Sequence, residues 1–330
     1  MTGAWRATPP DLADIDPADL RTIAPLLLAG AGAGLAWSRI RADSTLASTE
    51  AAAALREGHD RTVVLRAVRE QELAALVPAL NGRNVQFVLI KGWDLARRYP
   101  ERGMRSPGDI DLVVRPQDLA VTRQVATALT AGPVDLVHRA LEYPPASAEK
   151  LLRDHDEAIL GDRTVVPVPR HEDTLRIVCV HALQSEVELP RMLCDVGALV
   201  ESRPDDFDWD RCLTDDPVVA GWVRLVLRLA LTMVGAELSD APDATQGHIP
   251  QWVVPRVLRS WGRPVVRGRP AVLSIRHPRW WRSALAVRWS GPLRSAFLMG
   301  RPVPTRYRLP LQVRCYATRA AQSARRRRAL

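Results

Sequence analysis

Hydrophobic residues recur at helix spacing through the first eighty residues of the chain. The pattern is strongest at residues 20–28 and 46–80, where apolar positions alternate with polar ones at intervals of three and four. Ahead of it, Pro9, Pro10 and Pro17 interrupt any regular helix. The sequence therefore predicts several helices before the first strand.

Short apolar runs replace this pattern after residue 84. A helical stretch at about residues 116–129 separates the second run from the third, which favours a mixed α/β or α+β sheet. A charged segment that ends in Gly161 and Asp162 predicts a hairpin-like turn before the fourth run. The four predicted strands are residues 85–90, 110–114, 134–137 and 164–168.

The helical pattern returns after Pro169. His171, Glu172 and Asp173 open the first of these helices, where acidic side chains suit the helix dipole. A loop rich in Asp and Pro then precedes a region rich in Arg and Trp. These changes divide the chain into an N-terminal helical region (1–80), a sheet core (81–170), a helical bundle (171–240) and a basic C-terminal region (241–330).

Three glycines in the N-terminal region allow two interpretations. Gly30, Gly32 and Gly34 suggest a dinucleotide-binding fingerprint, in which a glycine-rich turn cradles phosphates. The third glycine of that fingerprint would fall on Leu35, and no βαβ pattern follows. The pattern favours the alternative, a glycine-rich helix or a close turn between two helices.

Paired carboxylates stand on the second predicted strand. Asp109 and Asp111 are two residues apart, so their side chains share one face while Ile110 points into the core. Two close carboxylates raise each other's pKa unless a cation neutralises them, and Mg²⁺ or Mn²⁺ suits oxygen ligands. Asp135, on the third strand, would complete a set of three that holds two metal ions. The alternative for such a pair is a solvated strand edge.

The end of the first strand offers the opposite charge. Lys91 supplies a cation, and Gly92 lets the backbone approach a phosphate closely at the start of a helix predicted over residues 93–99. Arg105, four residues before Asp109, would add a second cation. The parts of a metal-dependent phosphate site therefore follow one another within a strand-helix-strand unit.

The segment LIKGWDLARRYPERGMRSPGDIDLVVRPQDL resembles the signature of the uncharacterised nucleotidyltransferase family in the DNA polymerase β-like superfamily. The shared features are an LKG motif, an aromatic residue before proline, and an R-x-x-x-D-[IL]-D-L-[LV]-V block. The resemblance implies that Lys91 and Gly92 replace the phosphate-binding Gly-Ser motif of the superfamily. It further implies that Asp109 and Asp111 bind metal and that Asp135 is the third carboxylate.

Beyond this block, the resemblance extends over about residues 20–235. It implies a small mixed sheet flanked by helical regions, and a later helical segment that carries His181 and Asp195. On its own helix, His181 is more typical of a hydrogen-bonded core residue than of a ligand. His138, just after the third strand, is interpreted as a surface residue.

The implied reaction is a metal-dependent transfer of an NMP from an NTP to an acceptor hydroxyl. The acceptor is open among a small molecule, a protein side chain and an RNA end. Two alternatives remain: a toxin-like nucleotidyltransferase that acts on tRNA or another RNA, and an inactive nucleotide-binding or scaffold protein.

The C-terminal region is rich in positive charge and in tryptophan. The net charge is +9, and arginines with Trp261, Trp280, Trp281 and Trp289 gather after residue 256. Arginine beside aromatic residues suits nucleic acid or an anionic membrane surface. The favoured alternative is a flap whose tryptophans pack on the body of the protein.

The four widely spaced cysteines suggest core thiols in a reducing compartment. The polar, acidic start of the chain lacks the pattern of a secretory signal. The apolar stretch at residues 23–37 is too short to span a bilayer. We therefore expect a cytoplasmic protein without a transmembrane segment.

Overall fold

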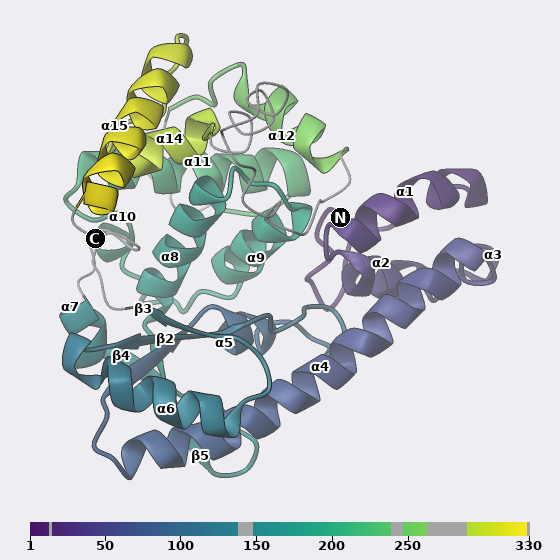
Figure 1. Cartoon of the computed structure of the whole chain (residues 1–330). Coiled ribbons are helices and arrows are strands. Elements are labelled where there is room, and N and C mark those ends of the chain that lie inside the picture. Colours follow the sequence, from purple (N-terminus) through teal and green to yellow (C-terminus); the bar gives the residue numbers. More distant parts are fainter. Residues whose placement is uncertain (13–14, 138–147, 239–246, 263–288, 329–330) are drawn as a thin grey trace.

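In the computed structural model, two small sheets lie below a helical bundle, and N-terminal helices extend to one side (Figure 1). The structure describes residues 1–12, 15–137, 148–238, 247–262 and 289–328. Small sheets among many helices confirm the predicted α+β class.

The N-terminal helices begin and end where the sequence provides caps. Asp16 starts the first helix by accepting hydrogen bonds from the backbone amides of Ala18 and Asp19 at 2.7 and 2.8 Å. The last helix of this region runs from the N-terminal lobe to the sheets (Figure 1). The four are α1 (Pro17–Ala29), α2 (Ala33–Ile40), α3 (Ser44–Ala47) and α4 (Glu50–Asn81).

The glycine cluster forms the turn between α1 and α2. Gly30 ends α1, and Gly32 precedes the first residue of α2. A side chain at Gly34 would place its Cβ 1.9 Å from the carbonyl oxygen of Gly103. Close backbone packing therefore accounts for Gly34, and the alternative of a helix-to-helix turn is confirmed.

Three of the four predicted strands form one mixed sheet in the order β1-β2-β3. The strand β1 (Phe87–Ile90) is antiparallel to β2 (Ile110–Val114), which is parallel to β3 (Val134–Val137). The parallel pair is joined by η1 (Pro116–Asp118) and α6 (Leu119–Leu129). After β1 the chain forms α5 (Gly92–Ala96), which is shorter than the helix predicted over residues 93–99.

The fourth predicted strand pairs outside this sheet. It is β5 (Thr164–Pro169), and its partner β4 (His155–Leu160) follows the short helix α7 (Ala148–Arg153). The charged segment before Gly161 was predicted only as the approach to a turn. It forms a strand because the hairpin pairs it with β5, burying Ala158 and Leu160 while its charged residues stay at the surface.

The two faces of the mixed sheet pack differently. Phe87, Leu89 and Leu112 share a core with apolar residues of α4, α6 and the hairpin. On the other face Val88, Ile90, Val113 and Val137 pack against α7 and Ile177. Since side chains alternate along a strand, Asp111 shares this second face with Val113.

The largest core belongs to the helical bundle. It includes α8 (His171–Gln184), α9 (Pro190–Glu201), α10 (Trp209–Leu213) and α11 (Pro217–Val234), together with Ala4 and Trp5 from the start of the chain. By length and composition α11 would suffice to cross a membrane, yet more than half of it is buried in the fold and packs against α8 and α9. The predicted four-region division of the chain stays a prediction.

The C-terminal helices lie on the far side of the bundle from the sheets (Figure 1). Trp261 donates a 2.8 Å hydrogen bond to the carbonyl of Val187, which confirms the packing alternative for this tryptophan. Trp289 packs beside Tyr316, with ring centroids 5.7 Å apart. Trp280, Trp281 and His138 lie outside the described residues. The helices are α12 (Val253–Trp261), α14 (Pro292–Leu298) and α15 (Leu309–Arg328).

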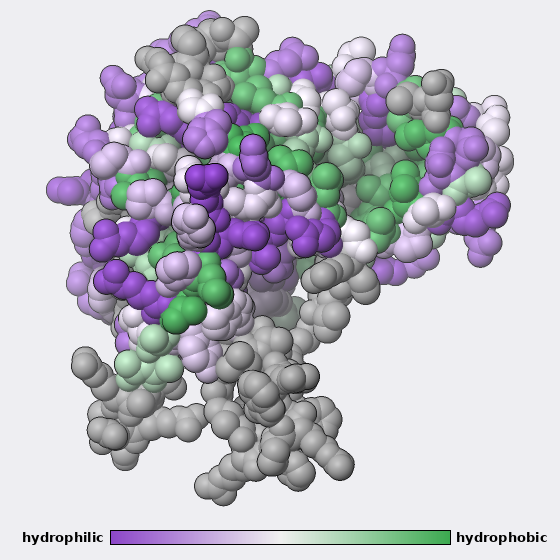
Figure 2. Space-filling model, turned by 90° about the horizontal axis from the view of Figure 1, so that it is seen from above, coloured by the Kyte–Doolittle hydropathy of each residue, from purple (hydrophilic) through white to green (hydrophobic). Residues whose placement is uncertain are grey.

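The surface seen from above is largely hydrophilic, with hydrophobic residues gathered on the N-terminal lobe at the right (Figure 2). That lobe holds an apolar pocket of about 370 Å³ lined by residues that include Leu20, Ile23 and Leu35. All four cysteines are buried and none forms a disulfide, as the sequence predicts.

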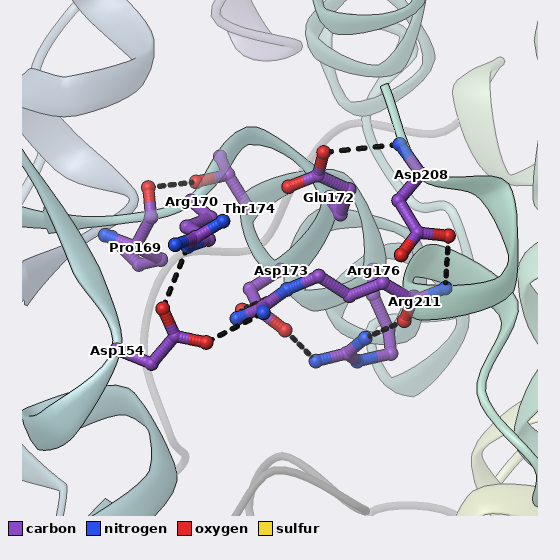
Figure 3. A network of polar contacts seen from close by, with 9 residues as sticks. All are labelled: Asp154, Pro169, Arg170, Glu172, Asp173, Thr174, Arg176, Asp208 and Arg211. Carbon is purple, nitrogen blue, oxygen red and sulfur yellow. Dashed lines mark hydrogen bonds and ion pairs between the residues drawn. The ribbon is translucent and has the colours of Figure 1, made fainter. Parts of the chain in front are cut away.

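An ion network centred on the buried carboxylate of Asp173 joins the hairpin region to the bundle (Figure 3). Asp173, at the start of α8, forms ion pairs with Arg176 and Arg211. Arg211 also binds Asp154 at 2.6 Å, and Arg170 binds the same carboxylate at 2.7 Å. Each side chain in this network meets an opposite charge, so it fixes α8 and α10 against the end of α7.

Candidate active site between the sheet and the helical bundle

A pocket of about 250 Å³ lies where the mixed sheet meets α8 and α9. All six residues that the sequence predicts for the site line it: Lys91, Gly92, Arg105, Asp109, Asp111 and Asp135. The opposite wall comes from the bundle, through His181, Arg191, Met192 and Asp195. The tertiary structure thus brings together segments about a hundred residues apart.

Strand register places the carboxylates. Ile90 is the partner of Asp111 across β1 and β2, and Asp111 is the partner of Asp135 across β2 and β3. Residues in one row of a sheet point to the same face, and neighbouring strands lie about 4.8 Å apart. Asp109 precedes β2 by one residue and shares the face of Asp111. The parallel pairing of β2 with β3 therefore brings Asp135 beside the pair.

The Lys91-Gly92 turn has an unusual backbone. Lys91 has φ of 55° and ψ of −133°, and Gly92 has φ of 37°. Such conformations cost a non-glycine residue about 1–3 kcal/mol and are found often at functional sites. A Cβ on Gly92 would lie 2.7 Å from the carbonyl oxygen of Asp109. The turn is therefore held tightly against the start of β2.

This turn directs the Lys91 side chain to the carboxylates. Its Nζ lies 2.8 Å from Oδ1 of Asp111, and both side chains are mostly buried. Burial raises the pKa of Asp111; Lys91 opposes that rise, while the charges of Asp135 and Asp109 add to it. Negative charge therefore exceeds what Lys91 neutralises at this end of the pocket.

Arg105 occupies the pocket wall with its guanidinium directed at protein acceptors. Its Nε and Nη2 each donate to Asp195 at 3.2 Å, and its Nη1 donates to the carbonyls of Gly92 at 2.8 Å and Ser106 at 2.7 Å. Tyr99 adds a 2.8 Å hydrogen bond to Asp195. Two roles are possible for Arg105: positioning the Gly92 turn, or the direct contact with phosphate that the sequence predicts. These contacts favour the positioning role.

Asp195 is ionised within this cluster. Burial alone would raise its pKa, but Arg105 and Arg191, with the hydrogen bonds from Arg105 and Tyr99, lower the pKa overall. The cluster links the Gly92 turn and the loop before β2 to α9, so it fixes the distance between the two walls of the pocket.

The bundle contributes two residues whose place in the site was not predicted. His181 faces the pocket from α8, although its apolar neighbours favoured a core histidine. Burial lowers its pKa to about 3, with further lowering by Lys91 and Arg191, so the imidazole is neutral at pH 7. Arg191, in the first turn of α9, was missed. Its one sequence signal is the spacing of four residues to Asp195, which places both on one face of the helix.

The carboxylates fit a divalent cation by their chemistry. Oxygen donors from Asp109, Asp111 and Asp135 are those that Mg²⁺ and Mn²⁺ prefer, and all three carboxylates line one pocket. Within the described ranges, no three His, Cys, Asp or Glu side chains are gathered closely enough to hold a metal ion. In this arrangement the Lys91 ammonium is the cation on Asp111.

A small mixed sheet presents paired aspartates beside a Lys-Gly turn, as the resemblance to nucleotidyltransferases implies. Residues 17–134 match the model of a family described as uncharacterised nucleotidyltransferase, so this region of the chain is similar to that family. The match confirms the resemblance predicted from the sequence and supports nucleotidyl transfer as the general activity. It covers less than half of the chain and ends one residue before Asp135. Among curated proteins, none matches the chain.

Proposed function

We propose that the protein transfers an NMP from an NTP to an acceptor hydroxyl in this pocket. The observation that carries the proposal is the convergence of Asp109, Asp111 and Asp135 on one sheet face beside the Lys91-Gly92 turn. Carboxylates and a phosphate-binding turn on one small sheet suit in-line transfer to a hydroxyl.

The reaction exchanges one P–O bond for another. The acceptor oxygen attacks the α-phosphorus of the NTP, and the bond from that phosphorus to the bridging oxygen breaks, so that pyrophosphate leaves. Asp135, which is exposed at the pocket, takes the proton of the hydroxyl. Lys91 and the backbone at Gly92 receive the phosphates. Asp109, Asp111 and Asp135 would have to come closer together than in this structure to hold Mg²⁺ or Mn²⁺, which would neutralise phosphate charge and lower the pKa of the hydroxyl.

The test is transfer of label from each of the four NTPs, with Mg²⁺ or Mn²⁺ and cell extract, by the wild type and by the Asp109→Ala/Asp111→Ala double variant. We expect label in a product of the wild type only. Equal labelling by both proteins, or by neither in any condition, would overturn the proposal. Fractionating the product into small molecules, protein and RNA identifies the acceptor.

The same experiment separates the alternatives. Label on RNA, with binding that weakens at higher salt, would identify an RNA-directed enzyme. NTP binding without turnover, unchanged by Asp135→Asn, would identify an inactive nucleotide-binding protein.

A further inference from the structure

Two arginines line the pocket, and they differ in how their hydrogen-bonding capacity is used. Arg105 directs Nε, Nη1 and Nη2 at acceptors on the protein, and its side chain is 6% exposed. Arg191 has an 18% exposed side chain and reaches Asp195 through one contact of 3.4 Å. Its Nε is buried and has no hydrogen-bond partner.

A buried donor without a partner costs free energy, which a bound acceptor would recover. Asp195 is a poor candidate for that acceptor, because Arg105 and Tyr99 already donate to its oxygens. Burial lowers the pKa of Arg191, and the charge of Arg105 adds to this effect. An anion in the pocket would offset both.

We propose that Arg191, rather than Arg105, is the arginine that binds the polyphosphate of the substrate. The guanidinium presents a planar fork of donors that matches two phosphate oxygens. Arg191 lies on α9, across the pocket from the aspartates and beyond the region that matches the family. The helical bundle therefore supplies a phosphate-binding group to the nucleotidyltransferase core, an inference that rests on the proposed function.

The neutral state of His181 supports the assignment of phosphate binding to Arg191. Burial keeps His181 unprotonated by lowering its pKa, and the charges of Lys91, Arg191 and Arg105 lower that pKa further. The substrate anion would then meet the cations of Lys91 and Arg191. The imidazole of His181 would add no positive charge at pH 7.

The test measures binding of sodium tripolyphosphate by calorimetry in the presence of EDTA, so that no metal ion contributes. The proteins are the wild type, Arg191→Gln, Arg191→Met, Arg191→Lys and a control, Arg259→Gln, which alters an exposed arginine on α12. We expect Arg191→Gln and Arg191→Met to weaken binding about tenfold or more, because a charge-assisted bidentate contact is lost. Arg191→Lys should be intermediate, and the control should stay within about twofold of the wild type.

A second measurement uses the wild type alone, so it does not depend on the folding of any variant. Phenylglyoxal modification of Arg191, followed by mass spectrometry, should fall when tripolyphosphate is added. Unchanged modification of Arg191, binding within twofold of wild type by folded Arg191→Gln, or no tripolyphosphate binding by the wild type would each overturn the inference.

Failure of this inference is distinguishable from failure of the proposed function. Tripolyphosphate binding that depends on Arg191, without label transfer by the wild type, would retain the inference and reject the transferase. Label transfer with an unchanged KM for NTP in Arg191→Gln would retain the transferase and reject the inference about Arg191.

Discussion

Two clusters of buried charge have a similar composition but differ in how completely they are paired. Around Asp173, two arginines bind one buried carboxylate, and Arg211 also donates to Asp154 while Arg176 donates to the carbonyl of Arg211 (Figure 3). In the pocket, Asp111 has Lys91 on one oxygen, Asp109 and Asp135 nearby, and Arg191 across the cavity with a donor unused. Burial of charge is common to both, so burial does not distinguish structure from function.

Hydrogen-bonding groups and charges that are left without a protein partner do distinguish the two clusters. A closed network holds elements in place, because every donor already has an acceptor on the protein. An open cluster next to a cavity has charge and hydrogen-bonding groups left over for a ligand. The Arg105–Asp195 pair belongs to the first kind although it lines the pocket, which is why we assign it to positioning.

The largest expected effect on stability is that of Asp173→Asn. Arg176 and Arg211 would keep their buried charges without the carboxylate, and breaking a buried pair costs about 3–5 kcal/mol. Urea unfolding measures the loss. A loss below about 1 kcal/mol would show that the network of Figure 3 is not the closed, structural cluster described above.

Gly92→Ala should have the next largest effect. The added Cβ meets the Asp109 carbonyl at 2.7 Å, and the positive φ adds strain, so we expect a loss of about 1–3 kcal/mol and little label transfer. Gly108→Ala is the matched control, since Gly108 also has positive φ but its Cβ would have no neighbour within 4 Å. Equal loss of transfer in both variants would remove the argument for close approach at Gly92.

Asp111→Asn should affect label transfer more than it affects stability. The raised pKa of Asp111 shows that its charge is held at a cost, so we expect a change in unfolding free energy below about 1 kcal/mol and label transfer at background. Label transfer above a tenth of the wild-type rate would contradict the role of this carboxylate. Loss of several kcal/mol would place Asp111 with Asp173 as a structural residue.

A pH dependence of stability should be carried by two histidines. Folding lowers the pKa of His181 to about 3 and of His171 to about 4, mainly through burial, from about 6.5 in the unfolded chain. At a pH between the folded and unfolded pKa values, the unfolded chain binds more protons than the folded protein does. Their contribution to stability is therefore complete above pH 6.5 and declines as the pH falls toward 4.

Urea midpoints between pH 7.5 and 4.5 test this dependence. His181→Asn should reduce the slope, and His171→Asn should do so separately, since one lies in the pocket and the other at the start of α8. An unchanged slope in both variants would show that these imidazoles are accessible to protons in the folded protein.

The sequence by itself determined the local parts of the site. A period of two placed Asp109 and Asp111 on one face, and the order of Lys91, Gly92 and the aspartates carried the resemblance to a nucleotidyltransferase family that the match over residues 17–134 confirms. Helix spacing predicted α4 and the helical region after Pro169, because an apolar stripe is a property of consecutive residues. His155–Leu160 had no such stripe, and only pairing with β5 made it a strand.

The tertiary structure alone decided which distant residues complete the pocket. Asp135 lies beside Asp111 through the register of two parallel strands, and register depends on how α6 returns the chain to the sheet. The stripe of α9 predicts which of its faces is buried but leaves its partner undefined. The placement of Arg191 and Asp195 across the pocket follows from packing between the bundle and the sheet, which is non-local by nature.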